Sequence, residues 1–277
     1  MAPVQLNRVL HLLKAYIFAL TFLQYHCRRV DAFSSLKMSV ETTAKHTLYD
    51  VPVSNNGARC RLILYKKGIP EDEVEIVSPA TMGGLRDPKY LTLNPQGKMP
   101  LLTSNQDGMN IPESDTICRY LTAQYVHLGP SFEPDNVKSN LISRLHDLYL
   151  TTIQGCMYKA SPPFGSFASR KSALAEYQKQ LQVIDDLIDD DKDGIYICGG
   201  DVTLADATLY PSIVFAKHIL PKFGIPEDQA IPSKIAKWFD EVKANDKDFE
   251  RIYDEVSHVL FKTKSNRKEN SSPFFTF

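Results

Sequence analysis

LYDVPVSNNGARCRLILYKKGI, residues 48–69, contains most of a strand, a loop and a helix in that order. The apolar segment 46–51 predicts a short buried strand, and residues 52–57 have the composition of a loop. Residues 58–67 have helical periodicity, and Gly68 follows them where glycine commonly ends a helix. The stretch therefore predicts a strand that runs through an exposed loop into a helix.

Alternating strand and helix signals continue to residue 127. We expect strands at 74–77, 99–103 and 109–111, a helical turn at 87–93, and a helix at 114–125 with Ser114 as its N-cap. Turn residues at 94–97 and 105–108 separate these elements. The predicted order over residues 46–127 is β-α-β-(α)-β-β-α, which makes this an α/β N-terminal domain.

The second half of the chain predicts helices and no convincing strand. Helical periodicity covers 137–158, 171–190, 203–219 and 233–258. We therefore expect an all-α C-terminal domain at 137–262, a Pro-containing linker at 128–136 and a polar, disordered tail at 263–277.

Composition excludes several classes of protein. Of the 277 residues, 43% are hydrophobic and 23% charged, as in an ordinary globular protein. The net charge of −1 gives no electrostatic reason to expect nucleic acid or an anionic membrane as a partner. The five cysteines include no C-x-x-C pair and the histidines lack metal-ligand spacing, so we expect neither a redox dithiol nor a metal site.

Residues 1–45 differ from the rest of the chain and are expected to form a targeting presequence or a disordered extension. Arg8 and Lys14 precede an apolar run at 16–25, which is too short to span a bilayer and fits the core of a signal peptide. Ala32-Phe33 and a hydroxyl-rich stretch follow. This arrangement resembles the bipartite plastid presequence of algae with secondary plastids. We expect a plastid location, with the cytoplasm as the alternative if translation starts at Met38.

Three short patterns place polar groups at the ends of the predicted elements. Ser54 precedes the first helix, whose N-terminus offers free N–H groups and about half a positive charge. A hydroxyl held there can donate a hydrogen bond to a bound thiolate and lower the thiol pKa. In ESDTICRYL (113–121), Ser114 suits a carboxylate and Glu113 suits an ammonium group, which together match the end of an α-amino acid. NPQGKMPLL (94–102) places Pro100 at the start of a strand.

In this order and spacing, the three patterns resemble those of serine-type glutathione transferases, including plant phi-class and bacterial members. The resemblance implies a thioredoxin-like glutathione-binding domain followed by an all-helical domain. Ser54 aligns with the catalytic serine of that family, with Arg59 five residues after it. Asn56 is a second catalytic candidate, because some related enzymes use an asparagine of this loop to reach the sulfur. Cys60 lies inside the helix, and we expect it to face the core.

The same resemblance implies how glutathione would be held. Pro100 would follow a cis peptide bond and turn the Met99 N–H and C=O toward the cysteinyl backbone, with Lys98 near the peptide. Glu113 and Ser114 would bind the γ-glutamyl end. Glutathione would be a co-substrate, and the family needs no other cofactor. The expected partners are glutathione, a small apolar electrophile in a detoxification reaction, and a second copy of the chain in a homodimer.

A fourth pattern, YICGGDVTLADATLYPS (196–212), resembles a signature of the family's C-terminal domain. Thr203 and Asp206 have the spacing of a capping box, which would serve folding rather than catalysis. We expect the electrophile to lie between Ser54 and the helical domain, against aromatic and apolar side chains of that domain (Tyr149, Met157, Tyr158, Phe164, Tyr210 and Phe215). Three functions stay open: a glutathione S-transferase, another glutathione-dependent isomerase or peroxidase, and a non-catalytic ligand carrier.

Overall fold

The computed structural model describes residues 43–133 and 135–265. The presequence predicted at 1–45 and the tail predicted at 263–277 lie outside this range, apart from the innermost residues of each. Within the described range, the residues from Ala44 to Ser265 form one compact unit, in which an α/β domain is followed by a helical domain.

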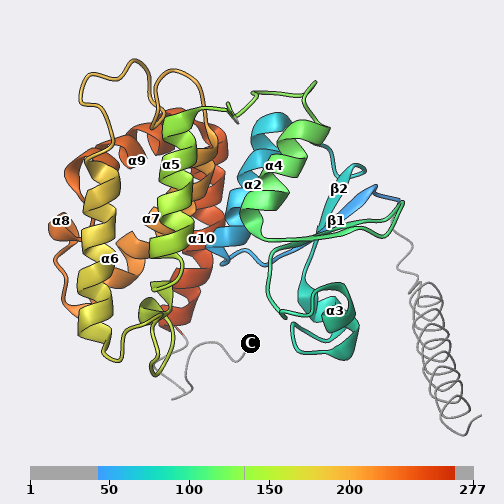
Figure 1. Ribbon diagram of the computed structural model, residues 1–277, viewed down its shortest axis with the longest axis horizontal. Coiled ribbons are helices and arrows are strands. Elements are labelled where there is room, and N and C mark those ends of the chain that lie inside the picture. Colours follow the sequence, from blue (N-terminus) through green and yellow to red (C-terminus); the bar gives the residue numbers. More distant parts are fainter. Residues whose placement is uncertain (1–42, 134, 266–277) are drawn as a thin grey trace, which may run out of the picture. The chain divides into compact units, whose positions relative to one another are not determined.

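The N-terminal domain is built on a mixed sheet of four strands, in the order β2-β1-β3-β4. β1 and β2 are parallel, because α2 connects them as a crossover, whereas β3 is antiparallel to both β1 and β4. Helices α2 and α4 lie between the sheet and the helical domain (Figure 1). The bounds are β1 His46–Tyr49, α2 Asn55–Lys67, β2 Val74–Val77, α3 Pro88–Leu93, β3 Leu101–Ser104, β4 Asn110–Pro112 and α4 Ser114–Gln124. The predicted element order and the thioredoxin-like fold are confirmed.

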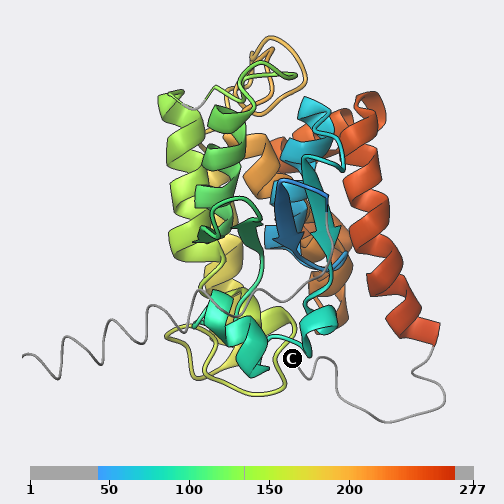
Figure 2. The same cartoon turned by 90° about the vertical axis from the view of Figure 1, so that its right-hand side faces the viewer.

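The C-terminal domain is entirely helical within the described residues. α5 (Val137–Leu145) continues into a π-helical turn (His146–Leu150), and a 3₁₀ turn (Gln154–Met157) follows it. The remaining helices are α6 Arg170–Asp185, α7 Leu204–Ile219, α8 Glu227–Ala230, α9 Ser233–Asn245 and α10 Lys247–Ser265, with a 3₁₀ turn at Leu220–Phe223. In Figure 2, α5 and α10 are seen to the left and right of the sheet, and Figure 1 shows that both lie beyond α2 and α4 on the same side of it.

The single helix predicted at 233–258 is wrong, because Asp246 divides it into α9 and α10. Asp246 has extended backbone angles, φ −132° and ψ 109°. Its carboxylate accepts a hydrogen bond from the Asp248 N–H at 3.1 Å, which satisfies a free donor in the first turn of α10. It also accepts from Lys66 of α2 at 2.8 Å. The break therefore anchors the start of α10 to the N-terminal domain.

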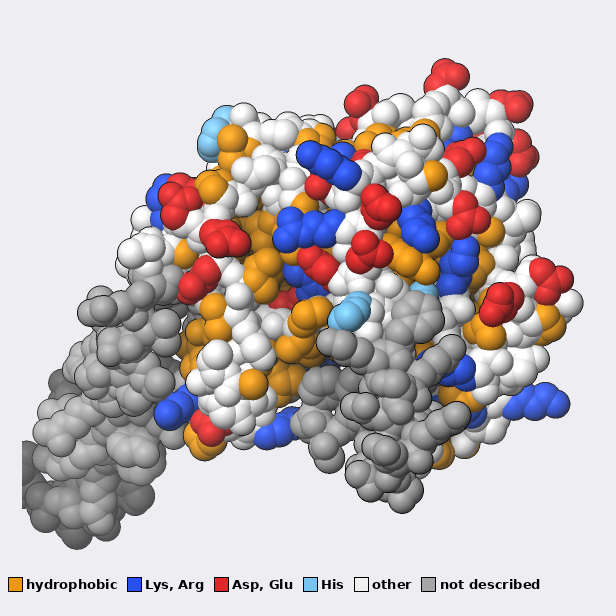
Figure 3. Space-filling view, turned by 180° about the vertical axis from the view of Figure 1, so that it is seen from behind, with side chains coloured by type: hydrophobic (Ala, Val, Ile, Leu, Met, Phe, Trp, Pro, Cys, Tyr) orange, Lys and Arg blue, Asp and Glu red, His pale blue; other side chains and the backbone are white. Residues whose placement is uncertain are grey.

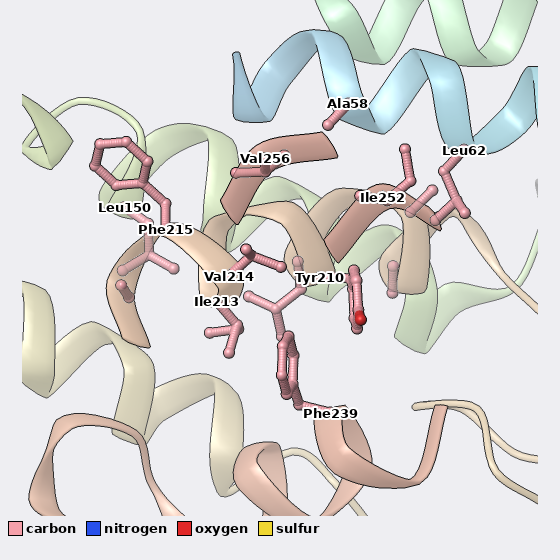
Figure 4. Close-up of a cluster of buried hydrophobic side chains, with 14 of the residues drawn as sticks. Ala58, Leu62, Leu150, Tyr210, Ile213, Val214, Phe215, Phe239, Ile252 and Val256 are labelled. Carbon is pink, nitrogen blue, oxygen red and sulfur yellow. The ribbon is translucent and has the colours of Figure 1, made fainter. Parts of the chain in front are cut away.

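Helix α7 is buried along almost its whole length and forms the centre of the core. Its Tyr210 ring stacks on Phe239 of α9, with 4.6 Å between the ring centroids. Figure 4 shows Ala58 and Leu62 of α2 in the same apolar cluster as the side chains of α7 and α10. The two domains therefore share one continuous hydrophobic core, and α2 belongs to both.

The predicted capping box at the start of α7 is confirmed. The Asp206 carboxylate accepts from the backbone N–H groups of Thr203 at 2.9 Å and Ile197 at 2.7 Å. It also accepts from the Trp238 indole N–H at 2.9 Å. Asp206 is fully buried, so this one side chain joins the loop before α7, α7 itself and α9.

The surface is mixed in charge. Figure 3 shows basic and acidic side chains side by side over one face, in keeping with the net charge of −1. Among residues 43–133 and 135–265, none of the helices is both long enough and apolar enough to cross a membrane.

Candidate glutathione-binding site

The register of the sheet brings the three predicted patterns to one edge. Tyr49 of β1 pairs with Leu101 of β3, and Leu101 pairs with Pro112 of β4. Since β3 is antiparallel to both neighbours, Pro100 and Glu113 follow directly beyond these pairs at the same edge. β1 leaves the sheet at this edge too, toward the loop that carries residue 54.

Ser54 is the N-cap of α2. Its backbone is extended, and its Oγ accepts a hydrogen bond from the Gly57 N–H at 3.0 Å. This cap starts the helix at Asn55, three residues before the start predicted at 58. Because the Gly57 contact uses Ser54 only as an acceptor, the hydroxyl hydrogen is left to donate to another group.

Asp50 lies behind Ser54 at the end of β1. Its carboxylate is 2% exposed and is ion-paired with Arg61. Burial raises the pKa of Asp50 to about 6, while the Arg61 charge and a hydrogen bond from the Ser54 hydroxyl oppose this rise. Asp50 therefore competes for the Ser54 hydroxyl hydrogen, which would have to turn from Asp50 to reach a bound thiolate. A Cβ at position 57 would lie 1.7 Å from Asp50 Oδ1, which explains the glycine there. Sequence reasoning missed Asp50, although a charged residue that ends an apolar strand is a signal.

The two asparagines of the loop have different roles. The Asn55 Nδ2 donates to Gln154 Oε1 and to Ser212 Oγ, both at 3.0 Å, so its carboxamide is held by the helical domain. Asn56 is partly exposed, and its backbone C=O accepts a weak contact from Cys60 Sγ. Asn56 therefore stays a candidate for the sulfur site, whereas Asn55, to which sequence reasoning gave no role, is part of the scaffold.

The Met99–Pro100 peptide bond is cis, as the family resemblance implies. Pro100 is buried and Met99 is partly exposed. The Lys98 carbonyl accepts from the Tyr90 hydroxyl at 2.7 Å and from Asn94 Nδ2 at 2.8 Å, which fixes the backbone just before the cis bond. The Lys98 side chain is exposed at the same edge of the sheet.

Glu113 has a strained backbone, with φ 69° and ψ 117°. An L residue rarely adopts positive φ, and such residues are concentrated at binding and catalytic sites. Glu113 precedes the first turn of α4 and its side chain is exposed, while Ser114 is 9% exposed. The free N–H groups of α4, the Ser114 hydroxyl and the Glu113 carboxylate are therefore adjacent, as a zwitterionic amino-acid end would require.

Arg59 connects this end of the site to α2 and to the helical domain. Its guanidinium, 1% exposed, donates to Asp115 at 2.7 Å and to Asp147 at 2.9 Å. A longer contact of 3.4 Å joins it to Ser114 Oγ. Beside this cluster, a polar cleft between α4 and α5 is lined by Asp115, Arg119, Asn140, Ser143, Arg144 and Asp147.

The proposed walls of the electrophile site are only partly supported. Tyr210, Phe164, Met157 and Phe215 are buried in the core, so these four expectations are wrong. Tyr158 is 41% exposed and meets Phe215 edge-on, with 6.2 Å between the ring centroids. Tyr149 is 48% exposed. Tyr149 and Tyr158 therefore stay as candidates.

The described cysteines are free and do not form a reactive site. Cys60 is fully buried, as predicted, with its Sγ 3.9 Å from that of Cys118. Burial raises the pKa of the Cys60 thiol well above its ordinary value, which keeps it protonated and unreactive. Among the described residues, no group of three or more His, Cys, Asp or Glu side chains could hold a metal ion.

The fold and the site define a two-domain protein of thioredoxin-like and helical halves. Family models described as "Glutathione S-transferase, N-terminal domain" and "Glutathione S-transferase, C-terminal domain" match residues 48–131 and 167–241, together more than half of the chain. The chain therefore belongs to the glutathione S-transferase family.

Individual relatives are distant. The chain is 25% identical to glutathione S-transferase 3 of Zea mays over 63% of this chain and 80% of the relative. It is 22% identical to glutathione S-transferase F10 of Arabidopsis thaliana over 72% of this chain and 92% of the relative. The crystal structure of glutathione transferase F2 from Populus trichocarpa superposes with a TM-score of 0.60 at 16% identity, covering 77% of this chain and 99% of that one. At this identity, the structural likeness shows the fold alone.

Proposed function

We propose that this protein is a serine-type glutathione S-transferase, in which Ser54 donates a hydrogen bond to the glutathione thiolate. One observation carries the proposal: the Ser54 hydroxyl lies at the N-terminus of α2, accepts a hydrogen bond from the Gly57 N–H, and has one hydrogen that can turn from Asp50 to a thiolate. The family membership of the chain supports glutathione as the ligand.

The chemistry follows from the cap. A free thiol is only a few per cent thiolate at pH 7. Each unit by which the site lowers the thiol pKa is worth about 1.4 kcal/mol, and the Ser54 hydrogen bond and the α2 N-terminus both favour the anion. The thiolate sulfur then forms a bond to an electrophilic carbon, the leaving group departs with its electron pair or the adduct takes up a proton, and the thiol proton goes to solvent. Asn56 is the alternative donor to the sulfur.

Glutathione would lie along the edge where the three patterns meet. The Met99 N–H and C=O would pair with the cysteinyl backbone, and Lys98 would lie near the peptide. Glu113 and Ser114 would hold the γ-glutamyl end at the start of α4. The strained backbone of Glu113 supports this placement, because such strain persists where a ligand site demands it.

Titration of the bound thiol at 240 nm tests the proposal. Wild type should lower the glutathione thiol pKa and turn over an aryl halide, while Ser54→Ala should lose most turnover and retain glutathione on an affinity resin. Turnover unchanged in Ser54→Ala but lost in Asn56→Ala would move the role to Asn56. Retention of glutathione by wild type with no thiol ionisation and no turnover would favour a ligand carrier.

We also propose that the protein forms a homodimer through α5 and the π-helical turn after it. Val137 and Leu141, four residues apart on α5, are 81% and 45% exposed, and Leu148 of the π-helical turn is 44% exposed. A stripe of this kind is typical of a surface that a partner covers. Sedimentation of wild type and Leu141→Asp tests the idea, which a monomeric wild type at micromolar concentration would refute.

Plastid import stays a proposal that rests on residues 1–45, nearly all of which lie outside the described range. A fluorescent protein fused behind residues 1–45 should enter the plastid of an alga with secondary plastids. A fusion in which the residues before Met38 are removed should stay in the cytoplasm. Cytoplasmic fluorescence from both fusions would overturn the proposal.

A further inference from the structure

A buried chain of hydrogen bonds runs from the loop beside Ser54 into the helical domain. The Asn55 Nδ2 lies 3.0 Å from Ser212 Oγ of α7, and Ser212 Oγ lies 2.7 Å from His146 Nε2. The opposite ring nitrogen, His146 Nδ1, lies 3.0 Å from Asp147 Oδ1. His146 is 1% exposed and Ser212 is 2% exposed, so neither side chain exchanges its partners with water.

Chemistry fixes the direction of every bond in this chain. The Asn55 NH₂ can only donate, so Ser212 Oγ accepts from it. The Asp147 carboxylate can only accept, so His146 Nδ1 carries a proton and donates it to Asp147. In a neutral ring Nε2 is then an acceptor, and it takes the Ser212 hydroxyl hydrogen. Burial lowers the pKa of His146 and Arg59 lowers it further, whereas Asp147 raises it; the net lowering favours the neutral ring that this chain requires.

The chain reaches both ends of the candidate site. Asn55 is the first residue of α2 and follows Ser54 directly, so a fixed carboxamide restricts the backbone that carries the Ser54 hydroxyl. At the other end, Asp147 is paired with Arg59, which contacts Ser114. The loop that would meet the cysteinyl sulfur and the helix start that would meet the γ-glutamyl end are thus tied to one hydrogen-bonded chain in the helical domain.

We propose that His146 and Ser212 are positioning residues of the glutathione site, which act through Asn55 to hold the Ser54 hydroxyl in line with the thiolate. This inference rests on the proposed function. Neither residue touches the ligand. Their effect is orientation, and an error of about 1 Å in the placement of a reacting group can cost about 100-fold in rate.

The test compares Ser212→Ala and His146→Phe with a matched control. Thr208→Val removes a buried hydroxyl one turn earlier on α7, where Thr208 Oγ1 lies 3.3 Å from Ser143 Oγ of α5. The hydrogen bond that this control removes joins α7 to α5 but does not reach the loop that carries Ser54. Ser212→Thr keeps the hydroxyl and serves as the conservative variant.

We expect Ser212→Ala and His146→Phe each to lower the thiolate fraction of bound glutathione near pH 6.5, and kcat with it, by about 3- to 10-fold. The KM for glutathione should change less than about twofold, because the γ-glutamyl and backbone contacts remain. Ser212→Thr should recover most of the loss, and Thr208→Val should leave the thiolate fraction at the wild-type value. Adding Asn55→Ala to Ser212→Ala should lower the thiolate fraction by less than the two separate losses combined, since both act through one chain; what remains reports the Asn55 contact with Gln154.

The outcomes separate this inference from the proposed function. If wild type does not ionise the bound thiol, the proposed function fails and this inference falls with it. If wild type ionises the thiol and Ser54→Ala does not, but Ser212→Ala behaves like Thr208→Val, only the positioning role is overturned. Should His146→Phe fail to fold, Ser212→Ala and Asn55→Ala decide the question by the same titration.

Discussion

Arg59 Nη1 of α2 lies 2.9 Å from Asp147 Oδ1, in the π-helical turn that follows α5. Arg59 is 1% exposed, so the guanidinium that contacts both the thioredoxin-like and the helical domain is buried away from water. Its other partner, Asp115 at 2.7 Å, belongs to α4. Three helices from two domains are therefore held by one cation.

Asp147→Asn should destabilise the fold through this cation. Removing one partner of a buried ion pair costs about 3–5 kcal/mol, and we expect about 1–3 kcal/mol here because Asp115 still compensates part of the Arg59 charge. The free energy of unfolding from urea titration measures the effect. Asp240→Asn is the control: its carboxylate pairs with Lys217 on the surface and is 67% exposed, so it should cost well under about 1 kcal/mol. Equal values for the two variants would contradict the buried role of Asp147.

Asp206→Asn should be more damaging. The change replaces an acceptor of four hydrogen bonds with a group that has one acceptor oxygen and brings unwanted donors into a fully buried site. We expect a loss of about 2–4 kcal/mol in the free energy of unfolding, with red-shifted Trp238 fluorescence if the indole contact opens. Asp189→Asn, whose side chain is 72% exposed, is the matched surface control. A loss below about 1 kcal/mol would mean that the cap carries little of the stability.

The elements of the N-terminal domain could be predicted because each carries a local signal. Strand 74–77 agrees with the structure, since an apolar strand is a short-range feature. α4 begins at Ser114, but its N-cap is Glu113, so the cap predicted at Ser114 is wrong by one residue. The sequence predicts the start of α2 three residues too late. Asn55 and Asn56 favour loops, and they are helical here because Ser54 caps the helix before them.

The support behind the site could not be predicted, because it depends on residues far apart in sequence. Asn55 meets Ser212 across a separation of 157 residues, and no periodicity or motif records such a contact. The expectation that Tyr210 lines the electrophile site fails for a related reason. Because α7 is buried on all sides, its sequence does not indicate which of its aromatic side chains face a ligand and which face the core.

His146 should make stability fall as the pH falls. Its pKa in the folded chain is lowered from 6.5 by burial first, with Arg59 adding to the effect and Asp147 opposing it. Below about pH 6.5, His146 therefore binds a proton in the unfolded chain but not in the folded chain, and the equilibrium moves toward unfolding. The destabilisation caused by His146→Gln should consequently be smaller at about pH 5.5 than at about pH 7.5, because the variant lacks this titration. Urea titrations at the two pH values check it, and a penalty that grows on acidification would contradict the sign.

Glu113→Gly should stabilise the fold and weaken glutathione binding. The wild-type backbone at φ 69° and ψ 117° costs an L residue about 1–3 kcal/mol, and glycine removes that strain at an entropic cost of about 0.5–1 kcal/mol. The Glu113 side chain is exposed and makes no cap hydrogen bond to α4, so little is lost from the folded state. The free energy of unfolding should therefore rise by up to about 2 kcal/mol while glutathione affinity, measured by calorimetry, falls. Glu113→Gln retains the strain and the shape but not the charge, and it should weaken glutathione binding without the gain in stability. If Glu113→Gly bound glutathione as tightly as wild type, the carboxylate would have no part in holding the γ-glutamyl ammonium group, and the strain would need another explanation.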